Sequence, residues 1–241
     1  MVSKNQLKLI KSLHQKKYRN EHGLFFVEGI KSITVLLNSN LRIYKLLATQ
    51  SLISDFSNTE VEEITAADLK KISALQNPSG ALAVFEIPKA KQINLEGWTI
   101  VLDAIRDPGN LGTIVRLCDW FGVKNLVCSK ETVDCYNPKV LQATMGSIAR
   151  VNIIYEDLEV FLPKIDMPIY GAFMKGDVIY KEEFLKEGIL ILGNEANGIS
   201  STIEAFIKKK ITIPQFGKKS AESLNVATAT GIILSEIIGR Q

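Results

Sequence analysis

The sequence predicts an α/β protein of two domains, and three of its features carry that prediction. From residue 98 onward, short aliphatic runs alternate with helical stretches, which is typical of a parallel sheet covered by helices. Two late runs, 189–192 and 211–214, lead into loops rich in polar groups, as strands that deliver a ligand-binding loop do. The first 90 residues alternate in the same way and are enough for a small domain of their own.

The first domain, residues 1–90, is expected to begin with an amphipathic helix over 5–18, in which Leu7, Ile10 and Leu13 repeat at helical spacing. Gly23 would end that helix. The other expected elements are strands at 24–27, 43–48 and 81–87, a helix at 30–37, and a strand end followed by a helix at 62–73. Thr65 is expected to cap the latter helix. The polar stretch 88–97 is interpreted as a linker.

The second domain, residues 97–241, is expected to alternate strands and helices. The expected strands lie at 98–104, 125–128, 151–155, 169–173, 189–192 and 211–214. The expected helices lie at 110–121, 139–148, 158–165 and from about Ser223 to the C-terminus. No G-x-G-x-x-G follows a strand and no phosphate loop is present, so a dinucleotide-binding domain is not supported.

Composition narrows the class of protein. A chain with 46% hydrophobic and 23% charged residues is an ordinary globular protein, and its basic N-terminus does not resemble a signal peptide. No apolar run approaches the roughly 20 residues of a membrane helix, so we expect no membrane association and a cytoplasmic location. Three cysteines without C-x-x-C spacing suggest reduced thiols. The only histidines, His14 and His22, lie far from the polar loops, so neither a histidine-based triad nor a metal site is expected.

Basic residues are concentrated at the N-terminus. The net charge of +3 is modest, but residues 1–31 hold seven basic side chains and only two acidic ones, Glu21 and Glu28. Such a segment is typical of a surface that binds a phosphate backbone. A solvated helix face is the alternative.

Three separated segments resemble, in order, the three motifs of the SpoU/TrmH family of SPOUT RNA methyltransferases. The first motif, N-x-G-x-x-x-R, is found at Asn110, Gly112 and Arg116. The second, L-x-G-x-E-x-x-G, is found at Gly193, Glu195 and Gly198, with Ile191 in the leucine position. The third is Ile213-Pro214 followed by S-L-N-V-A at 223–227.

This resemblance implies a SPOUT domain, an α/β knot in which a parallel sheet is threaded into a trefoil, and a homodimer formed through the C-terminal helix. It implies transfer of a methyl group from S-adenosylmethionine to a ribose 2′-hydroxyl of RNA, with rRNA favoured over tRNA. The last helix carries apolar and small residues on more than one face, so burial inside one subunit stays an alternative.

The N-terminal segment resembles, more loosely, the L30e-like substrate-binding domain that precedes many SpoU-type catalytic domains. Basic residues come first there, and a hydrophobic F-x-V-E-G strand follows. The resemblance implies RNA contacts by Lys16, Lys17 and Arg19.

The resemblance assigns catalytic roles to five residues. Arg116 is expected to stabilise the developing alkoxide, because an arginine stays protonated and donates several hydrogen bonds. Pairing with Asp119 or Glu131 is its structural alternative. Asn110 either caps a helix or orients the active site, and Glu195 either holds Asn110 or Arg116 or is a solvated turn carboxylate.

The remaining two lie at the start of the last helix. Ser223 is expected to be an N-cap or a substrate contact, while Asn225, expected inside the helix, is the stronger functional candidate. The loop before them is two residues longer than in common bacterial relatives, which leaves open whether Ser220, Glu222 or Ser223 reaches the site.

Five residues are assigned to the cofactor. Gly193, Ile213 and Leu224 match positions whose backbone groups bind S-adenosylmethionine in the family, and Asn194 and Thr144 are added from the neighbouring loops. Three other functions stay open: a non-catalytic RNA-binding or ribosome-assembly protein with the SPOUT fold, an unrelated nucleotide-binding enzyme, and a base methyltransferase.

Overall fold

The computed structural model describes residues 2–89, 92–217 and 223–240. The chain divides into two compact units, Met1–Lys89 with Asp134–Ala149, and Ala90–Val133 with Arg150–Gln241. The segment 134–149, which falls inside the second expected domain, therefore packs with the first unit. The domain boundaries 1–90 and 97–241 themselves stay a prediction.

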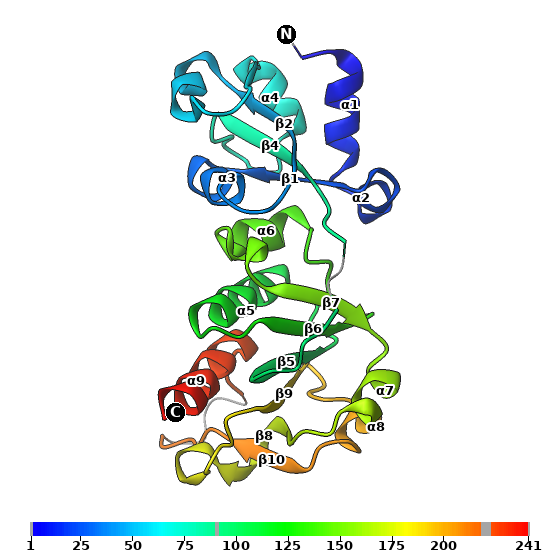
Figure 1. Cartoon of the computed structure of the whole chain (residues 1–241), viewed down its shortest axis with the longest axis vertical. Helices are drawn as coiled ribbons and strands as arrows, with labels where there is room; N and C mark the ends of the chain where they lie inside the picture. The colour runs from blue at the N-terminus through cyan, green and yellow to red at the C-terminus, as the bar shows by residue number, and fades with distance from the viewer. Residues whose placement is uncertain (1, 90–91, 218–222, 241) are drawn as a thin grey trace. The chain divides into compact units, whose positions relative to one another are not determined.

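The first unit contains a four-stranded sheet in the order β1-β4-β2-β3 (Figure 1). Strands β1 and β2 are antiparallel to β4, while the short β3 is parallel to β2. The strand bounds are Leu24–Glu28 (β1), Ile43–Ala48 (β2), Glu62–Glu63 (β3) and Ala81–Glu86 (β4). The helices are α1 (Lys4–Ser12), α2 (Lys16–His22), α3 (Ile30–Leu37), the 3₁₀ helix η1 (Gln50–Phe56) and α4 (Ala66–Ile72). Thr65 caps α4 as predicted, accepting a hydrogen bond from the Asp68 amide.

The single helix expected over residues 5–18 is two helices. Helix α1 ends before Leu13, and Gln15 adopts an extended conformation before α2 begins. Periodicity alone could not reveal this break, because the apolar residues of α1 keep helical spacing up to it and pack into the core of the unit. Gly23 ends α2 in the left-handed conformation, at φ 63°, as predicted.

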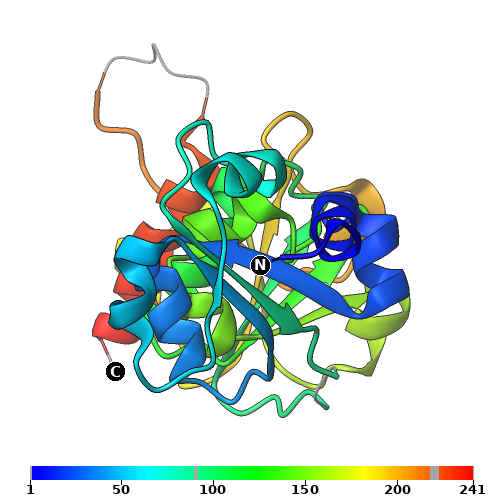
Figure 2. The ribbon, with the colours of Figure 1, turned by 90° about the horizontal axis from the view of Figure 1, so that it is seen from above.

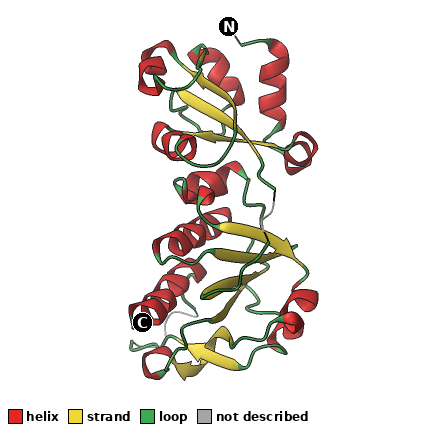
Figure 3. Cartoon of the chain, in the orientation of Figure 1, coloured by secondary structure: helices red, strands yellow, loops and turns green. Residues whose placement is uncertain are grey.

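The second unit is built on a six-stranded, fully parallel sheet in the order β10-β8-β9-β5-β6-β7. The strand bounds are Trp98–Asp103 (β5), Asn125–Ser129 (β6), Asn152–Glu156 (β7), Ile169–Val178 (β8), Gly188–Gly193 (β9) and Lys209–Thr212 (β10). Helices α5 (Pro108–Trp120) and α9 (Val226–Gly239) cover one face, and α7 (Leu158–Phe161) and α8 (Ser201–Glu204) cover the other (Figure 3). The predicted parallel α/β architecture is confirmed.

Two expected helices are shorter than predicted. Helix α6 (Pro138–Thr144), in the segment that packs with the first unit, stops because Met145 takes a left-handed conformation at φ 50°. The stretch expected as a helix over 158–165 turns into a 3₁₀ helix, η3 (Leu162–Lys164), at Pro163. Two other 3₁₀ helices are η2 (Ser147–Ala149) and η4 (Ile179–Lys181).

The register of the central strands places the functional loops together. Asp103, the last residue of β5, pairs with Gly193, the last residue of β9, so both loops leave the sheet at one carboxyl edge. Ligands of open α/β sheets bind at this edge. The implied trefoil knot stays a prediction, since residues 218–222 of the loop that enters α9 lie outside the described part. No helix in the described part is long and apolar enough to cross a membrane.

Candidate active site

The loop between β5 and α5 positions Asn110 inside a helix rather than at its cap. Asp107 is the N-cap, and its side chain accepts a hydrogen bond from the Asn110 amide at 2.8 Å. Pro108 follows at the first helical position, where no amide hydrogen is needed. The expectation that Asn110 begins or caps this helix is therefore corrected. Its side chain is left free for another contact.

The start of α9 corrects two further expectations. Helix α9 begins at Val226, and Asn225 is its N-cap, since the Asn225 Oδ1 accepts from the amides of Ala227 and Thr228 at 3.0 and 3.1 Å. Ser223 is exposed and lies two residues before the cap. Asn225 was expected inside the helix and Ser223 at its start, and the capping bonds of Asn225 exclude both placements.

Asn225, Asn110 and Glu195 form one directed chain of hydrogen bonds. Because the Asn225 oxygen accepts from the helix amides, its nitrogen must be the donor, and it donates to Asn110 Oδ1 at 2.8 Å. The Asn110 nitrogen then donates to Glu195 Oε1. The chain thus runs from the α9 amides to a carboxylate, and it joins the three segments that carry the motifs. Glu195 is exposed, and its second oxygen forms no hydrogen bond or ion pair with any other described residue.

Asn194 fastens the loop after β9 to the loop after β5. Its side-chain nitrogen donates to the Ala104 carbonyl at 2.8 Å, and its oxygen accepts from the Ala196 amide at 2.9 Å. Ala104 itself has a positive φ of 57°, which a non-glycine residue rarely adopts. Both polar atoms of Asn194 make a hydrogen bond within the protein, and these bonds hold the backbone that presents Glu195. The expected cofactor contact by Asn194 stays a prediction.

Gly193 is required by the close approach of two backbone segments. The loop folds back on itself through paired hydrogen bonds between Asn194 and Gly198. A Cβ at Gly193 would lie 2.1 Å from the Gly198 carbonyl carbon and 2.2 Å from the Ile199 nitrogen. No side chain can relieve such a clash, so an alanine here would displace the loop.

We therefore expect Gly193→Ala to lower stability by about 1–3 kcal/mol and turnover on the order of 10²-fold. Thermal melting and a methyl-transfer assay would measure the two effects. Gly239→Ala is the matched control, because a Cβ added there meets nothing within 4 Å. Wild-type turnover in Gly193→Ala would show that the loop can move without cost to function.

Arg116 is not part of the hydrogen-bonded chain within one subunit. It is exposed and makes no hydrogen bond or ion pair with any residue in the described ranges. Its alternative partner Asp119 accepts instead from Arg150, at 2.9 and 2.6 Å. Arg116 lies six positions after Asn110 on α5, so the two side chains point about 120° apart around the helix axis. Within one chain, Arg116 therefore makes no hydrogen bond or ion pair with Glu195 or Asn225, and its catalytic role stays a prediction.

The family model for "SpoU rRNA Methylase family" matches residues 97–235, more than half of the chain. The chain belongs to the SpoU rRNA methylase family. A second model, "MRM3-like substrate binding domain", matches residues 4–83. The expectation of a SpoU-type domain after an N-terminal substrate-binding domain is confirmed.

Relatives of this SpoU chain span its whole length. It is 27% identical to the 23S rRNA (guanosine(2553)-2'-O)-methyltransferase RlmP of Bacillus subtilis, with 98% of each chain covered. Among solved structures, a putative RNA methyltransferase of the TrmH family from Porphyromonas gingivalis is 37% identical over 100% of both chains, with a TM-score of 0.90. An AdoMet-bound rRNA methyltransferase from Sinorhizobium meliloti is 27% identical over 100% of this chain and 97% of that one, with a TM-score of 0.87.

The other residues assigned to the cofactor divide into two groups. In the SpoU domain, Ile213 is half-buried just after β10, and Leu224 is exposed just before α9. Thr144 is fully buried, its hydroxyl donates to the Leu141 carbonyl at 2.7 Å, and it packs with the first unit, so a cofactor contact does not fit it. Ser220 and Glu222 lie outside the described residues.

Of the three residues expected to bind RNA, only two are accessible. Lys16 and Lys17 are exposed on α2, but Arg19 is 2% exposed. The Arg19 guanidinium donates to Asp134 at 2.5 and 3.1 Å and to the carbonyls of Leu13 and His14. The expected RNA contact by Arg19 is therefore corrected, because its donors are occupied inside the first unit.

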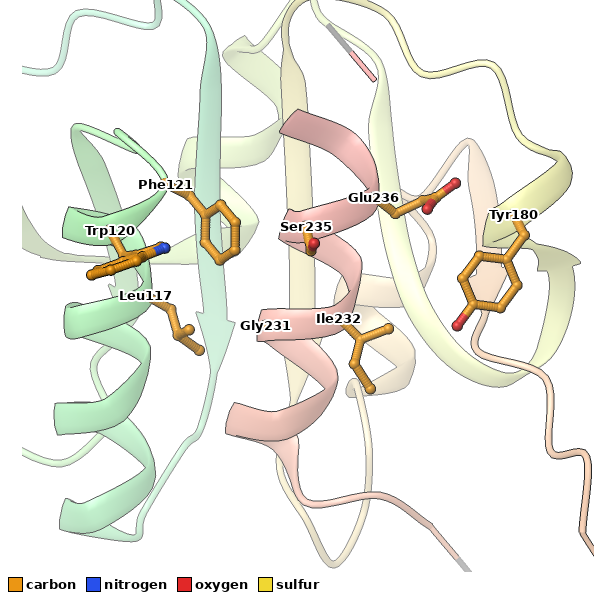
Figure 4. A pocket seen from close by; sticks show the side chains of 8 residues that line it. All are labelled: Leu117, Trp120, Phe121, Tyr180, Gly231, Ile232, Ser235 and Glu236. Atoms are coloured by element: carbon orange, nitrogen blue, oxygen red, sulfur yellow. The ribbon is translucent and has the colours of Figure 1, made fainter. Parts of the chain in front are cut away.

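A groove between α5 and α9, about 580 Å³ in volume, was not anticipated from the sequence. Its apolar walls come from α5, α9 and η4 (Figure 4), and its lining includes Leu117, Trp120, Phe121, Tyr180 and Ile232. Trp120 is 84% exposed, which is unusual for so large an apolar side chain. The apolar residues on more than one face of the last helix indicated the α9 wall, but helical periodicity alone does not separate the exposed stripe of α5 from a buried one.

Proposed function

We propose that the chain is an S-adenosylmethionine-dependent methyltransferase that acts on a ribose 2′-hydroxyl of RNA, with rRNA favoured over tRNA. The chain from Asn225 through Asn110 to Glu195 carries this proposal, because it ties the three motif segments together at the ligand-binding edge of the sheet. The rRNA methyltransferases among its full-length relatives support the substrate class. A non-catalytic RNA-binding protein with the same fold is the alternative, and we expect the protein in the cytoplasm.

The loops suit a bound cofactor in the positions that the motifs assign. Gly193 allows the tight turn of the loop after β9, and the half-buried Ile213 and exposed Leu224 offer apolar surface in the two other segments. S-adenosylmethionine would supply an activated methyl group. The residues of this chain then have to orient the ribose and favour loss of its hydroxyl proton. The carboxylate of Glu195, held through one oxygen by Asn110, keeps its other oxygen for the ribose or for an arginine.

The groove between α5 and α9 supports a homodimer. An exposed tryptophan beside further apolar side chains is the composition of a protein interface. Arg116 lies four residues before Trp120, on the same side of α5, so a second subunit covering the groove would also approach Arg116. We propose that the guanidinium of one subunit and the Asn225–Asn110–Glu195 chain of the other complete one active site.

Methyl transfer from labelled S-adenosylmethionine to rRNA tests the proposed function directly. We expect label in rRNA that lacks the modification and little label in tRNA. The digested product should contain alkali-resistant dinucleotides, because methylation removes the 2′-hydroxyl that would otherwise attack the adjacent phosphate and cleave the strand. Calorimetry should detect binding of S-adenosylmethionine without RNA. Cofactor binding without transfer to any RNA would favour the non-catalytic alternative, and label on a base would contradict ribose methylation.

A further inference from the structure

A second groove lies entirely within the first unit, and none of the motif residues lines it. It has a volume of about 780 Å³ and is lined by α1, α2 and the C-terminal end of α4. Helices α1 and α2 lie next to each other in two perpendicular views (Figures 1 and 2). The lining residues that carry charge or aromatic rings are Lys8, Lys11, His14, Tyr18, His22 and Lys71.

The groove is lined by basic side chains, and none of its lining residues is acidic. Lys8 and Lys11 lie one turn apart on α1, are exposed, and form no ion pair with any other described residue. Lys71 is partly neutralised, since its Nζ lies 2.7 Å from Asp68 Oδ1 and the hydrogen bond lowers the pKa of that carboxyl. Two ammonium groups without an ion-pair partner among the described residues are therefore available to a ligand of opposite charge.

An aromatic pair forms part of the same groove. The rings of Tyr18 and His22 stack on one face of α2, with centroids 6.4 Å apart and planes 16° apart. The Lys17 ammonium lies 5.7 Å from the Tyr18 centroid. Planar rings beside cationic side chains are the elements with which proteins hold single-stranded nucleic acid, because bases stack on the rings while lysines follow the phosphates.

The walls of the groove are fixed before any ligand arrives. The His14 ring bonds to the Ile72 carbonyl at 2.7 Å, and since a carbonyl only accepts, the His14 Nε2 is the donor. This bond ties the end of α1 to the end of α4. Arg19 holds the turn between α1 and α2 by donating to the Leu13 and His14 carbonyls. A preformed groove loses less conformational entropy on binding than a flexible surface does.

We propose that this groove binds an unpaired stretch of the substrate RNA, with phosphates at Lys8 and Lys11 and a base stacked at Tyr18. The inference rests on the proposed function, and it assigns RNA recognition to a defined face of the N-terminal unit. A groove of this volume falls in the range of about 300–1,000 Å³ that encloses small ligands. It therefore suits an exposed nucleotide, whereas a duplex is recognised across its wide minor groove.

The test compares variants of the full-length chain in their binding to a short, fluorescently labelled single-stranded RNA. Lys8→Gln/Lys11→Gln is expected to lower affinity at least about tenfold and to flatten the slope of log affinity against log salt by roughly 1.4, about 0.7 for each phosphate contact. Tyr18→Leu removes the stacking ring but keeps an apolar side chain, and we expect a loss of about tenfold with an unchanged salt slope. Lys31→Gln/Lys124→Gln, exposed lysines outside the groove, is the charge-matched control and should bind like the wild type.

Several outcomes would overturn the assignment. Equal losses in the groove variant and its control would show only a general charge effect. Duplex RNA competing as well as the single strand, or a poly-glutamate peptide competing better than RNA, would point to another ligand. Because the binding assay needs no cofactor, failure of RNA binding at the groove can be distinguished from failure of the proposed methyl transfer. Calorimetry with S-adenosylmethionine should give the same affinity for the groove variants and the wild type, so loss of cofactor binding would mark a failure of the catalytic domain instead.

Discussion

Arg116→Ala is expected to lower the rate of methyl transfer by about 10²–10³ while leaving cofactor affinity and melting temperature close to those of the wild type. The rate should fall because a charged donor that stabilises the developing oxyanion is lost. The fold should persist because Arg116 is exposed and has no partner among the residues that the structure describes. Single-turnover kinetics with saturating RNA, calorimetry and thermal melting would measure the three quantities. Near-normal turnover would remove Arg116 from its assigned role.

Subunit mixing would show whether Arg116 acts across a dimer. Arg116→Ala and Asn225→Ala should each be inactive as homodimers. If a site takes Arg116 from one subunit and Asn225 from the other, a mixed dimer contains one site with both residues intact, and activity should partly return. If both residues act within one subunit, every site in the mixed dimer carries one defect and activity stays low. Arg116→Lys, which keeps the charge but not the planar fork of donors, should recover only part of the rate.

The strands of the catalytic unit could be predicted because their side chains carry the signal locally. Strands β5 and β9 contain continuous aliphatic runs at 100–102 and 189–192, as strands buried on both faces do. Their parallel pairing brings the loops at Asp103 and Gly193 to one edge. The convergence of Asn110 with Glu195 then follows from the topology. Family motifs were needed to decide that these polar residues matter.

The helix caps could be predicted only in part. The sequence Asp-Pro at 107–108 is itself a signal for an N-cap followed by the first helical residue, and it indicates Asp107 rather than Asn110. No such signal separates Ser223 from Asn225, since either side chain can cap a helix. The choice is settled by a contact between Asn225 and Asn110, which lie 115 residues apart in the chain.

Arg19 shows the limit of an argument from local charge. It lies among exposed lysines, and nothing in its neighbourhood of the sequence separates it from them. Its partner Asp134 is 115 residues away, in the segment that packs with the first unit. A guanidinium is buried only with a partner such as that distant carboxylate. Local charge therefore predicted an RNA contact by Arg19, whereas the structure shows a buried ion pair with Asp134.

Arg19→Ala should therefore destabilise the first unit rather than weaken RNA binding alone. The substitution leaves the Asp134 carboxylate, 13% exposed, without its cation and leaves two carbonyls without donors. Breaking a buried pair in this way costs about 3–5 kcal/mol, a large share of the roughly 5–15 kcal/mol that stabilises a typical domain. We expect the melting temperature to fall by on the order of 10 °C or more. Urea unfolding followed by circular dichroism would measure the change in free energy.

Lys17→Ala is the matched control for this prediction, because Lys17 is exposed on the same helix and its loss should change stability by no more than about 0.5 kcal/mol.

The two interpretations of Arg19, a surface RNA contact and a buried ion pair, differ in which measurement changes. A surface arginine that contacts phosphate would leave the melting temperature alone and flatten the salt dependence of RNA binding by about 0.7–0.9. If Arg19 is buried, Arg19→Ala lowers the melting temperature. The double substitution Arg19→Met/Asp134→Leu removes both charges and should recover much of that loss, because no unpaired carboxylate remains. A stable Arg19→Ala variant with weakened RNA binding would contradict the buried pair.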